Sequence, residues 1–453
     1  MTGQAPGRRA ADPGRGASQR ILRDEAELVA GVMKIRFFPL VVHAAEGATI
    51  TDPDGRGYLD FTAAGGVAQL GYRHPEIARA VAAELATTWS TMHCCYVSEP
   101  TVELARALSA LLPGPRKVWF GTTGSDANDC LATLVPLATG RQRMASFAGS
   151  YHGQTAGSAA LSGHPAQRAR SGGSVTTVPY PYPYRCPHGP CPADECSLGC
   201  VRDIEAALDA SDEPLGALIM ESVQSDGGEL VPPRNVFPAL RRACDQRGAW
   251  LLFDEVKVGL GRTGRMFGFE HGDVVPDAVS LGKPLGGGLP LSAVIARPEL
   301  FEPDVLVLST LGGSPVPARA GLATLDVIQR DSLVARAAVM GQRLLEGLRD
   351  LQRDHPLIGD VRGRGLIAGV ELVEDRATRQ PARRKTHAVV YRCFELGLVT
   401  IYAGVYGNVI ELTPPLVLTD QELALGLGIL DQALGDVEGG RFDHSKLAGY
   451  AGW

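Results

Sequence analysis

A lysine and an aspartate follow two short apolar runs in the middle of the chain, and this pattern favours chemistry on an aldehyde. Residues 250–253 (WLLF) are followed by Asp254, and residues 278–281 (AVSL) by Gly282 and Lys283. Such runs are typical of buried parallel strands with functional residues at their carboxyl ends. There Lys283 could form a Schiff base with an aldehyde cofactor, while Asp254 keeps a basic ring nitrogen protonated. Spacing alone favours a simpler alternative, a surface ion pair.

A glycine-bearing loop that opens a helix has the residue types of a phosphate site. Residues 119–140 predict a strand end, a loop with Gly124 and Ser125, and a helix with Asp126 and Asp129 in its first turns. Free N–H groups and the positive end of the helix dipole suit a phosphate. Serine and aspartate are also good helix caps, so the pattern alone leaves a structural role open.

Two further apolar segments lead to candidate site residues. Tyr151 and His152 follow a short apolar segment, and residues 215–223 (LGALIMESV) predict a buried strand that carries Glu221 near its end. A tyrosine after a strand is commonly a core residue, so the position alone does not assign a function to Tyr151.

Composition predicts an ordinary soluble protein. The 453 residues are 45% hydrophobic and 21% charged, enough for two domains that share a large core. A formal net charge of −6 gives no reason to expect nucleic acid or an anionic membrane as partner. No apolar run reaches the length of a membrane span. Residues 1–20 lack the apolar segment of a signal peptide, so we expect a disordered extension and a cytoplasmic protein.

Four cysteines lie close together in the segment RCPHGPCPADECSLGC, residues 185–200. Cys186, Cys191, Cys196 and Cys200 are separated by four, four and three residues, with His188 among them. Their density suggests zinc, but the CxxC pairs of a strong zinc motif are absent. We therefore predict no metal and a surface insertion with free thiols, because disulfides do not suit a cytoplasmic chain.

The order of predicted elements indicates a large α/β domain and a smaller α+β domain. Residues 37–60 predict short strands with a turn at 52–55, and residues 361–373 another strand-like segment. Helical spacing covers residues 75–89, 101–112, most of 319–355, 386–396 and a final helix from 420. We expect a large domain at 62–318 with a mostly parallel sheet, and a small domain from residues 21–61 and 319–453.

Two motifs resemble the cofactor-lysine region of the class III aminotransferase family. These are DEVKVGLGRTG at residues 254–264 and PDAVSLGKPLGGGLPLSAV at residues 276–294. The family consists of fold type I enzymes that use pyridoxal 5′-phosphate (PLP), so the resemblance implies this cofactor and a seven-stranded type of sheet. It places Lys283 on the PLP aldehyde, Asp254 at the ring nitrogen, Gly124 and Ser125 at the phosphate, and Tyr151 on the ring face.

The resemblance also implies a homodimer with shared active sites. Thr310, in the segment STLGGSP, resembles a threonine that reaches the phosphate of the other subunit; the alternative is an ordinary hydroxyl in a glycine-rich turn. The full predicted cofactor-binding set is Gly124, Ser125, Tyr151, His152, Glu221, Asp254, Val256, Lys257, Lys283 and Thr310.

Three residues depart from the pattern of the family's transaminases. Lys257 stands where they usually carry glutamine beside the phenolic oxygen of PLP, and Asp226 where they commonly have glycine or glutamate. Glu411 replaces an arginine that holds the α-carboxylate of the substrate, so this position cannot bind that carboxylate in bidentate fashion. Asp226 could move a proton on the face of the substrate opposite Lys283. For Lys257, a harmless exposed lysine is the alternative.

These departures, with HPLIGDVRGRGL at residues 355–366, resemble the racemase and epimerase branch that includes α-amino-ε-caprolactam racemase and isoleucine 2-epimerase. The resemblance implies inversion of the α-carbon of an amino acid, amide or lactam through a Schiff base and a quinonoid carbanion. The predicted catalytic residues are Lys283, Asp254, Asp226 and Lys257. An aminotransferase is the first alternative; a PLP-dependent decarboxylase or oxygenase and a non-catalytic protein of this fold are the others. The side-chain specificity is not predicted.

Overall fold

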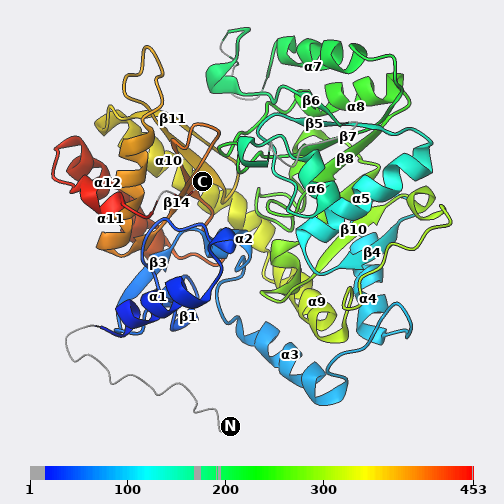
Figure 1. The fold of residues 1–453 in the computed structure, drawn as a ribbon, viewed down its shortest axis with the longest axis horizontal. Helices are drawn as coiled ribbons and strands as arrows, with labels where there is room; N and C mark the ends of the chain where they lie inside the picture. Colours follow the sequence, from blue (N-terminus) through cyan, green and yellow to red (C-terminus); the bar gives the residue numbers. More distant parts are fainter. Residues whose placement is uncertain (1–15, 168–174, 190, 192–194, 451, 453) are drawn as a thin grey trace, which may run out of the picture.

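A mixed sheet of seven described strands forms the centre of the larger part of the molecule (Figure 1). The computed structural model describes residues 16–167, 175–189, 191, 195–450 and 452. In this sheet β10 pairs with β4 and β9 in antiparallel orientation, and the other neighbouring strands pair in parallel. The strand order is β4 (Lys117–Gly121), β10 (Ser292–Ala296), β9 (Ala278–Leu281), β8 (Trp250–Asp254), β7 (Leu215–Glu221), β5 (Arg143–Phe147) and β6 (Val175–Val178).

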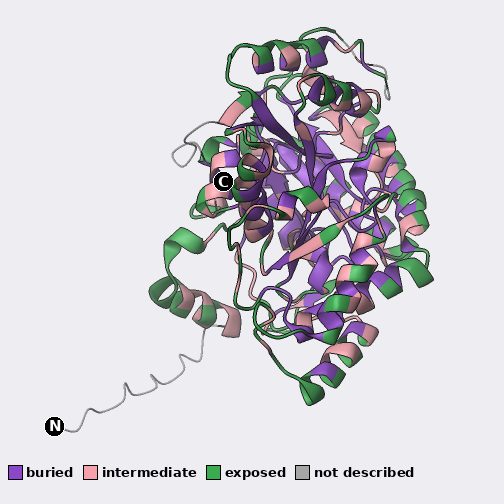
Figure 2. Cartoon of the chain, turned by 90° about the vertical axis from the view of Figure 1, so that its right-hand side faces the viewer, coloured by how far each residue is buried: buried purple, intermediate pink, exposed green. Residues whose placement is uncertain are grey.

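The central strands are buried because helices cover the sheet. Every residue of β7 and β9 is buried, as the continuous apolar runs predict for a parallel sheet covered on both faces. Figure 2 shows these strands as the buried centre of the chain. The helices that pack against strands of this sheet are α4 (Glu99–Ser109), α5 (Gly124–Thr139), α6 (Ala156–Leu161), α7 (Gly199–Asp209) and α8 (Val236–Gln246). Two further helices, α3 (Pro75–Thr87) and α9 (Pro315–Arg330), pack against each other, and α9 also packs against α4. The predicted α/β class with a mostly parallel sheet is confirmed.

Both ends of the chain contribute to the smaller part. In its first sheet β13 (Leu398–Val399) runs parallel to β3 (Gly57–Asp60), which continues through β2 (Thr49–Thr51) to β1 (Ala44–Glu46). The second sheet is antiparallel, in the order β11 (Ile358–Gly363), β12 (Ala368–Leu372), β15 (Val409–Leu412) and β14 (Ile401–Ala403). Three helices accompany these sheets: α10 (Leu333–Asp354), α11 (Arg383–Leu396) and α12 (Asp420–Glu438).

Two of the predicted domain limits, residues 20 and 319, lie inside helices. The expected start of the C-terminal part, residue 319, falls inside α9, which packs against α3, α4 and the 3₁₀ helix η5 (Lys283–Gly286) of the larger part. The extension predicted for residues 1–20 is helical from Ala17, where α1 (Ala17–Leu28) begins. Asp54 accepts hydrogen bonds from the first amides of α1, which explains why the helix begins there. Residues 1–15 lie outside the described residues.

The remaining elements are short. They are α2 (Ala63–Gly66) and the 3₁₀ helices η1 (Gly31–Met33), η2 (Pro165–Gln167), η3 (Pro183–Arg185), η4 (Gly268–Gly272), η6 (Pro298–Phe301) and η7 (His444–Leu447). No helix within the described ranges combines the length and the apolar composition needed to cross a membrane.

The cysteine-rich segment is more buried than predicted. All nine cysteines are free thiols, but Cys196 and Cys200 are buried. The sulfur of Cys196 lies 3.6 Å from that of Cys191 and 3.5 Å from that of Cys200. Asn235 explains the burial, because its side chain exchanges two hydrogen bonds with the backbone of Cys196. Among the described residues, no group of three or more His, Cys, Asp or Glu side chains forms a metal-binding cluster.

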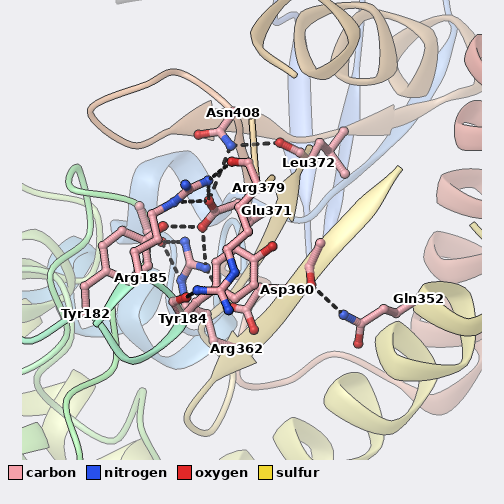
Figure 3. A network of polar contacts seen from close by, with 12 residues as sticks. Tyr182, Tyr184, Arg185, Gln352, Asp360, Arg362, Glu371, Leu372, Arg379 and Asn408 are labelled. Atoms are coloured by element: carbon pink, nitrogen blue, oxygen red, sulfur yellow. Dashed lines mark hydrogen bonds and ion pairs between the residues drawn. The ribbon is translucent and has the colours of Figure 1, made fainter. Parts of the chain in front are cut away.

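A polar network joins the segment before these cysteines to the smaller part (Figure 3). The buried Glu371 of β12 accepts hydrogen bonds from Tyr182, Arg185 and Arg362. The distance from Nη1 of Arg362 to Oε2 of Glu371 is 2.8 Å. Arg362 also donates to the carbonyl oxygen of Gly228, at 2.6 and 2.9 Å. The network therefore holds the loop between β7 and α8 against β11.

Candidate active site

A cavity of about 200 Å³ lies at the carboxyl ends of β7, β8 and β9. All predicted site residues except Thr310 line it: Gly124, Ser125, Tyr151, His152, Glu221, Asp226, Asp254, Val256, Lys257 and Lys283. The structure adds five lining residues that the sequence did not single out: Asn128, Gly153, Val223, Ser225 and Val258.

Asp254 is held in a fixed orientation at the end of β8. Its Oδ2 accepts hydrogen bonds from Asn128 Nδ2 at 2.7 Å and pairs with His152 Nδ1 at 2.8 Å, while its Oδ1 accepts from the amide of Val256 at 3.0 Å. Asn128 lies one helical turn after Gly124, on the same face of α5. That spacing could have identified Asn128 in the sequence.

The amino end of α5 forms another wall of the cavity. The amides of Gly124 and Ser125 come first in the helix and have no acceptor in a preceding turn. Gly124 also permits close packing, because a Cβ at this position would lie 2.5 Å from Cγ1 of Val256. The two amides and the positive end of the helix dipole are therefore suited to an anion.

Glu221 fixes the backbone of two loops rather than offering a free carboxylate. Its Oε1 accepts from the amide of Tyr151 at 3.0 Å, and its Oε2 from the amide of Ser225 at 3.1 Å. Burial, together with the nearby Asp254 and Asp226, raises the pKa of Glu221 well above its ordinary value. Glu221 therefore positions Tyr151 and the loop that carries Asp226.

Asp226 is half-buried in the wall of the cavity, in the loop between β7 and α8. Its carbonyl oxygen accepts a hydrogen bond from the amide of Gly404, which follows β14, at 2.9 Å. Arg362 holds the carbonyl of Gly228 in the same loop. The position of this carboxylate therefore depends on a loop of the larger part and on contacts that the smaller part makes with that loop.

Lys283 begins η5 with φ +23°, a backbone conformation that is rare for a residue with a side chain. Such strain is often retained at functional sites. Burial of the amine and the nearby positive charge of Lys257 lower the pKa of Lys283. A lowered pKa makes the free amine more available, as a nucleophile or a proton acceptor requires.

The structure joins two of the three departures, Lys257 and Glu411, in one ion pair. Nζ of Lys257 lies 2.6 Å from Oε1 of Glu411 and 3.1 Å from Oε1 of Glu229. Burial favours the neutral amine, but the two carboxylates outweigh this effect and raise the pKa of Lys257 above its ordinary value. Lys257 is therefore a buried cation and not the exposed lysine of the simpler alternative.

Thr310 does not reach the cavity. It is exposed in the loop between η6 and α9 and is not among the residues that line the site. Its predicted contact with the phosphate of another subunit stays a prediction.

Comparisons with known proteins agree with the resemblance seen in the sequence. The aminotransferase class-III family model matches residues 32–434. The chain is 34% identical to leucine/methionine racemase of Thermococcus litoralis and 36% identical to isoleucine 2-epimerase of Lentilactobacillus buchneri. Each alignment covers 96% of this chain and 99% of the relative.

Aminotransferases are similar to the same degree. The chain is 35% identical to 5-aminovalerate aminotransferase of Pseudomonas aeruginosa, over 92% of this chain and 97% of that protein. Among solved structures, an aminotransferase of Bacillus anthracis matches with a TM-score of 0.85 and 32% identity, covering 92% of this chain and 98% of that one. Overall similarity therefore does not separate inversion from amino transfer.

Proposed function

This chain belongs to the class III aminotransferase family, and on that premise we propose that it is a racemase or epimerase. The reaction inverts the α-carbon of an amino acid or of its amide or lactam. One observation carries the proposal: Lys283 and Asp226, two side chains able to carry protons, line the same cavity. Inversion requires one group to remove the α-proton and another to supply a proton to the opposite face.

The cofactor is pyridoxal 5′-phosphate, and the residues of the cavity fit it. The amides of Gly124 and Ser125 would hold its phosphate, Asp254 its ring nitrogen, and Lys283 its aldehyde. When bound, PLP supplies a ring that draws electrons away from the α-carbon of the substrate, which makes the α-proton acidic. The fixed orientation of Asp254, with three hydrogen-bond donors, suits a contact with a protonated ring nitrogen.

The protein side chains then perform two proton transfers. The amine of Lys283, whose pKa is lowered, accepts the α-proton from one face of the substrate. The carboxyl group of Asp226 donates a proton to the other face, either directly or through a water molecule that it orients. One proton leaves and one arrives, so the substrate is inverted without a second substrate.

The ion pair of Lys257 and Glu411 supports inversion over amino transfer. An aminotransferase must bind a keto acid as well as an amine. The resemblance implies that aminotransferases of this family hold the carboxylate of the substrate with an arginine at the position of Glu411. Glu411 is instead 98% buried and engaged by Lys257, so it cannot bind a carboxylate. The named activities of the racemase and epimerase relatives also support an amino acid substrate.

The experiment that tests the proposal is incubation of the PLP-loaded protein with single enantiomers in D₂O, without any keto acid. The substrates are amino acids, their amides and caprolactam, and the products are read by chiral chromatography and mass. We expect inversion with one deuterium gained at the α-carbon. Formation of a keto acid in a single turnover, without inversion, would contradict the proposal.

An aminotransferase remains the second candidate, because aminotransferases match this chain as well as the racemases do. The roles of Lys283 and Asp254 are the same in both reactions, so these residues do not discriminate. A requirement for a keto acid as amino acceptor, at rates above those of inversion, would favour this alternative.

We also infer a homodimer in which each subunit completes the site of the other. Thr310 is exposed, and the apolar side chains of Leu306, Leu308 and Leu311 beside it are exposed as well. Exposed apolar side chains concentrated in one loop favour a protein interface. In such a dimer Thr310 would contact the phosphate in the partner subunit.

A further inference from the structure

Glu229 is a buried carboxylate with an unusual backbone, and none of the roles described above uses it. It lies in the loop between β7 and α8, its exposed fraction is 0%, and its φ is +52°. A residue with a side chain adopts this left-handed conformation at a cost, and such strain is often retained at functional sites. Oγ of Ser225 donates to its carboxyl oxygens at 3.1 and 3.2 Å, which fixes the group further.

Glu229 meets Lys257 and Glu411 although the three residues come from different elements. Glu229 belongs to the loop after β7, Lys257 follows β8, and Glu411 lies in β15 of the smaller part. The carboxyl groups of Glu229 and Glu411 lie 3.1 and 2.6 Å from the same ammonium group. The ammonium group of Lys257 donates a hydrogen bond to Oε1 of Glu229 and forms an ion pair with Glu411, at the edge of the cavity that Lys257 lines.

The position of Lys257 also depends on Gly66. A Cβ at Gly66 would lie 3.3 Å from Cγ of Lys257 and 3.8 Å from Cδ of Lys283, so the stems of both lysines lie against this glycine. The stem of Lys257 is confined at Gly66, and its ammonium group is confined at the two carboxyl groups. Small movements of that ammonium group change its distance from Lys283.

Burial and the charges around Glu229 favour its protonated form. Burial and the neighbouring Glu411 raise the pKa of Glu229 to about 8, against the opposing effect of Lys257. The other charged groups that act on the cluster are Asp226 of the same loop and the buried Arg262, which follows β8. Near neutral pH Glu229 therefore keeps its proton, while Lys257 stays positively charged.

We propose that Glu229 is a positioning residue of the active site, which together with Glu411 holds the ammonium group of Lys257 beside Lys283. The proposal deepens the proposed function and rests on it in taking Lys283 as the lysine that binds PLP and moves the proton. Its consequence is that the proton affinity of Lys283 depends on Glu229, although Glu229 does not line the cavity.

The test is a pH titration of the visible absorption of the PLP-loaded protein, which needs no substrate. Glu229→Gln keeps the acceptor for Lys257 but cannot ionise, whereas Glu229→Leu removes the acceptor. The matched control is Glu255→Gln, because Glu255 is another buried carboxyl group but binds Ser222 and the amides of Gly268 and Phe269.

We expect Glu229→Leu to shift the apparent pKa of the absorption upward, because Lys257 loses one anchor and its charge acts less on Lys283. The absorption of Glu229→Gln should follow that of the wild type below about pH 7. The change in absorption near pH 8, where Glu229 loses its proton in the wild type, should be absent. The control should follow the wild type. The proposal would be overturned if the absorption of Glu229→Leu had the same apparent pKa as that of the wild type. It would also be overturned if Glu229→Gln kept the change in absorption near pH 8.

Two further results distinguish a failure of this proposal from a folding defect and from a failure of the proposed function. If Glu229→Leu does not fold, the step near pH 8 in Glu229→Gln still decides the matter. If the wild type shows no inversion while the spectral shifts occur as expected, the proposed function fails and the positioning role of Glu229 stands.

Discussion

Two lysines in one cavity have opposite pKa shifts, and their partners explain the difference. Lys283 lies beside another cation, and burial lowers its pKa. Lys257 lies between two carboxyl groups, which raise its pKa in spite of burial. One lysine is therefore suited to proton transfer and the other to a permanent positive charge. The same residue type performs both tasks because the surrounding charges differ.

The raised pKa of Glu229 predicts a pH dependence of folding stability. In the unfolded chain this group ionises near its ordinary value of 4.5, and in the folded chain near 8. Between these values the folded state binds the extra proton, so the contribution of Glu229 to the free energy of unfolding is fully present below about pH 4.5 and is lost as the pH rises to about 8. Glu229→Gln should remove this part of the fall.

The measurement is thermal unfolding of the apoprotein between pH 5 and pH 9, wild type against Glu229→Gln. Burial also raises the pKa of Glu255 to about 7, so Glu255→Gln is again the control, and it should remove only the lower part of the slope. A wild-type slope that survives unchanged in Glu229→Gln would show that Glu229 does not titrate in this range.

At the scale of single residues, the sequence predicted most of the residues that line the cavity but not their charge balance. Lys283, Asp254 and Glu221 could be predicted because each stands at the end of an apolar run. Glu229 could not, because its partners are Lys257, 28 residues away, and Glu411 in β15. No local pattern records contacts between such distant residues.

Three neighbouring parallel strands bring the site together at the element scale. β7, β8 and β9 carry or precede Glu221, Asp254 and Lys283, and parallel neighbours place their carboxyl ends at one edge of the sheet. The apolar runs predicted these strands. They did not predict that β10 enters antiparallel between β4 and β9, because strand order depends on the path of the connections.

The packing of α5 against the loop after β8 gives a prediction at this scale. In Gly124→Ala the added methyl group would lie 2.5 Å from Cγ1 of Val256, so either the side chain of Val256 or the amino end of α5 must shift at the wall of the cavity. We expect PLP affinity to fall about tenfold or more, roughly 1.4 kcal/mol, with a destabilisation of about 1–3 kcal/mol. Fluorescence titration with PLP measures the first effect, and thermal unfolding the second.

Gly428→Ala in α12 is the control, because a Cβ there meets nothing within 4 Å. It should leave PLP affinity unchanged. Equal affinities of Gly124→Ala and the wild type would show that the start of α5 does not bind the phosphate.

At the scale of the whole molecule, the two parts are tied together around the site. β13 from the C-terminal region pairs with β3 from the N-terminal region, and Arg362 and Gly404 hold the loop of Asp226. The sequence predicted a small domain from both chain ends, since strand and helix patterns occur on either side of the large sheet. The predicted limit at residue 319 lies inside α9, and helical periodicity does not show which part α9 packs against.

Shared active sites would make two inactive variants complement each other. Lys283→Ala has an intact Thr310, and Thr310→Arg has an intact Lys283. If Thr310 acts in the partner subunit, mixed dimers contain one complete site each, so the mixture should recover roughly a quarter of the wild-type activity. Chiral chromatography of the refolded mixture, with each variant alone as control, measures this recovery. No recovery from a mixture shown to contain mixed dimers would contradict a shared site.

In the proposed reaction, Lys283 and Asp226 exchange protons on two opposite faces of the substrate. The most direct test is Asp226→Asn with a single enantiomer in D₂O, with the wild type as reference, read by mass and chiral chromatography. We predict that the variant still exchanges the α-proton for deuterium on the Lys283 face, with retained configuration, while inversion falls about 10²-fold or more. Inversion at the wild-type rate in this variant would contradict the account.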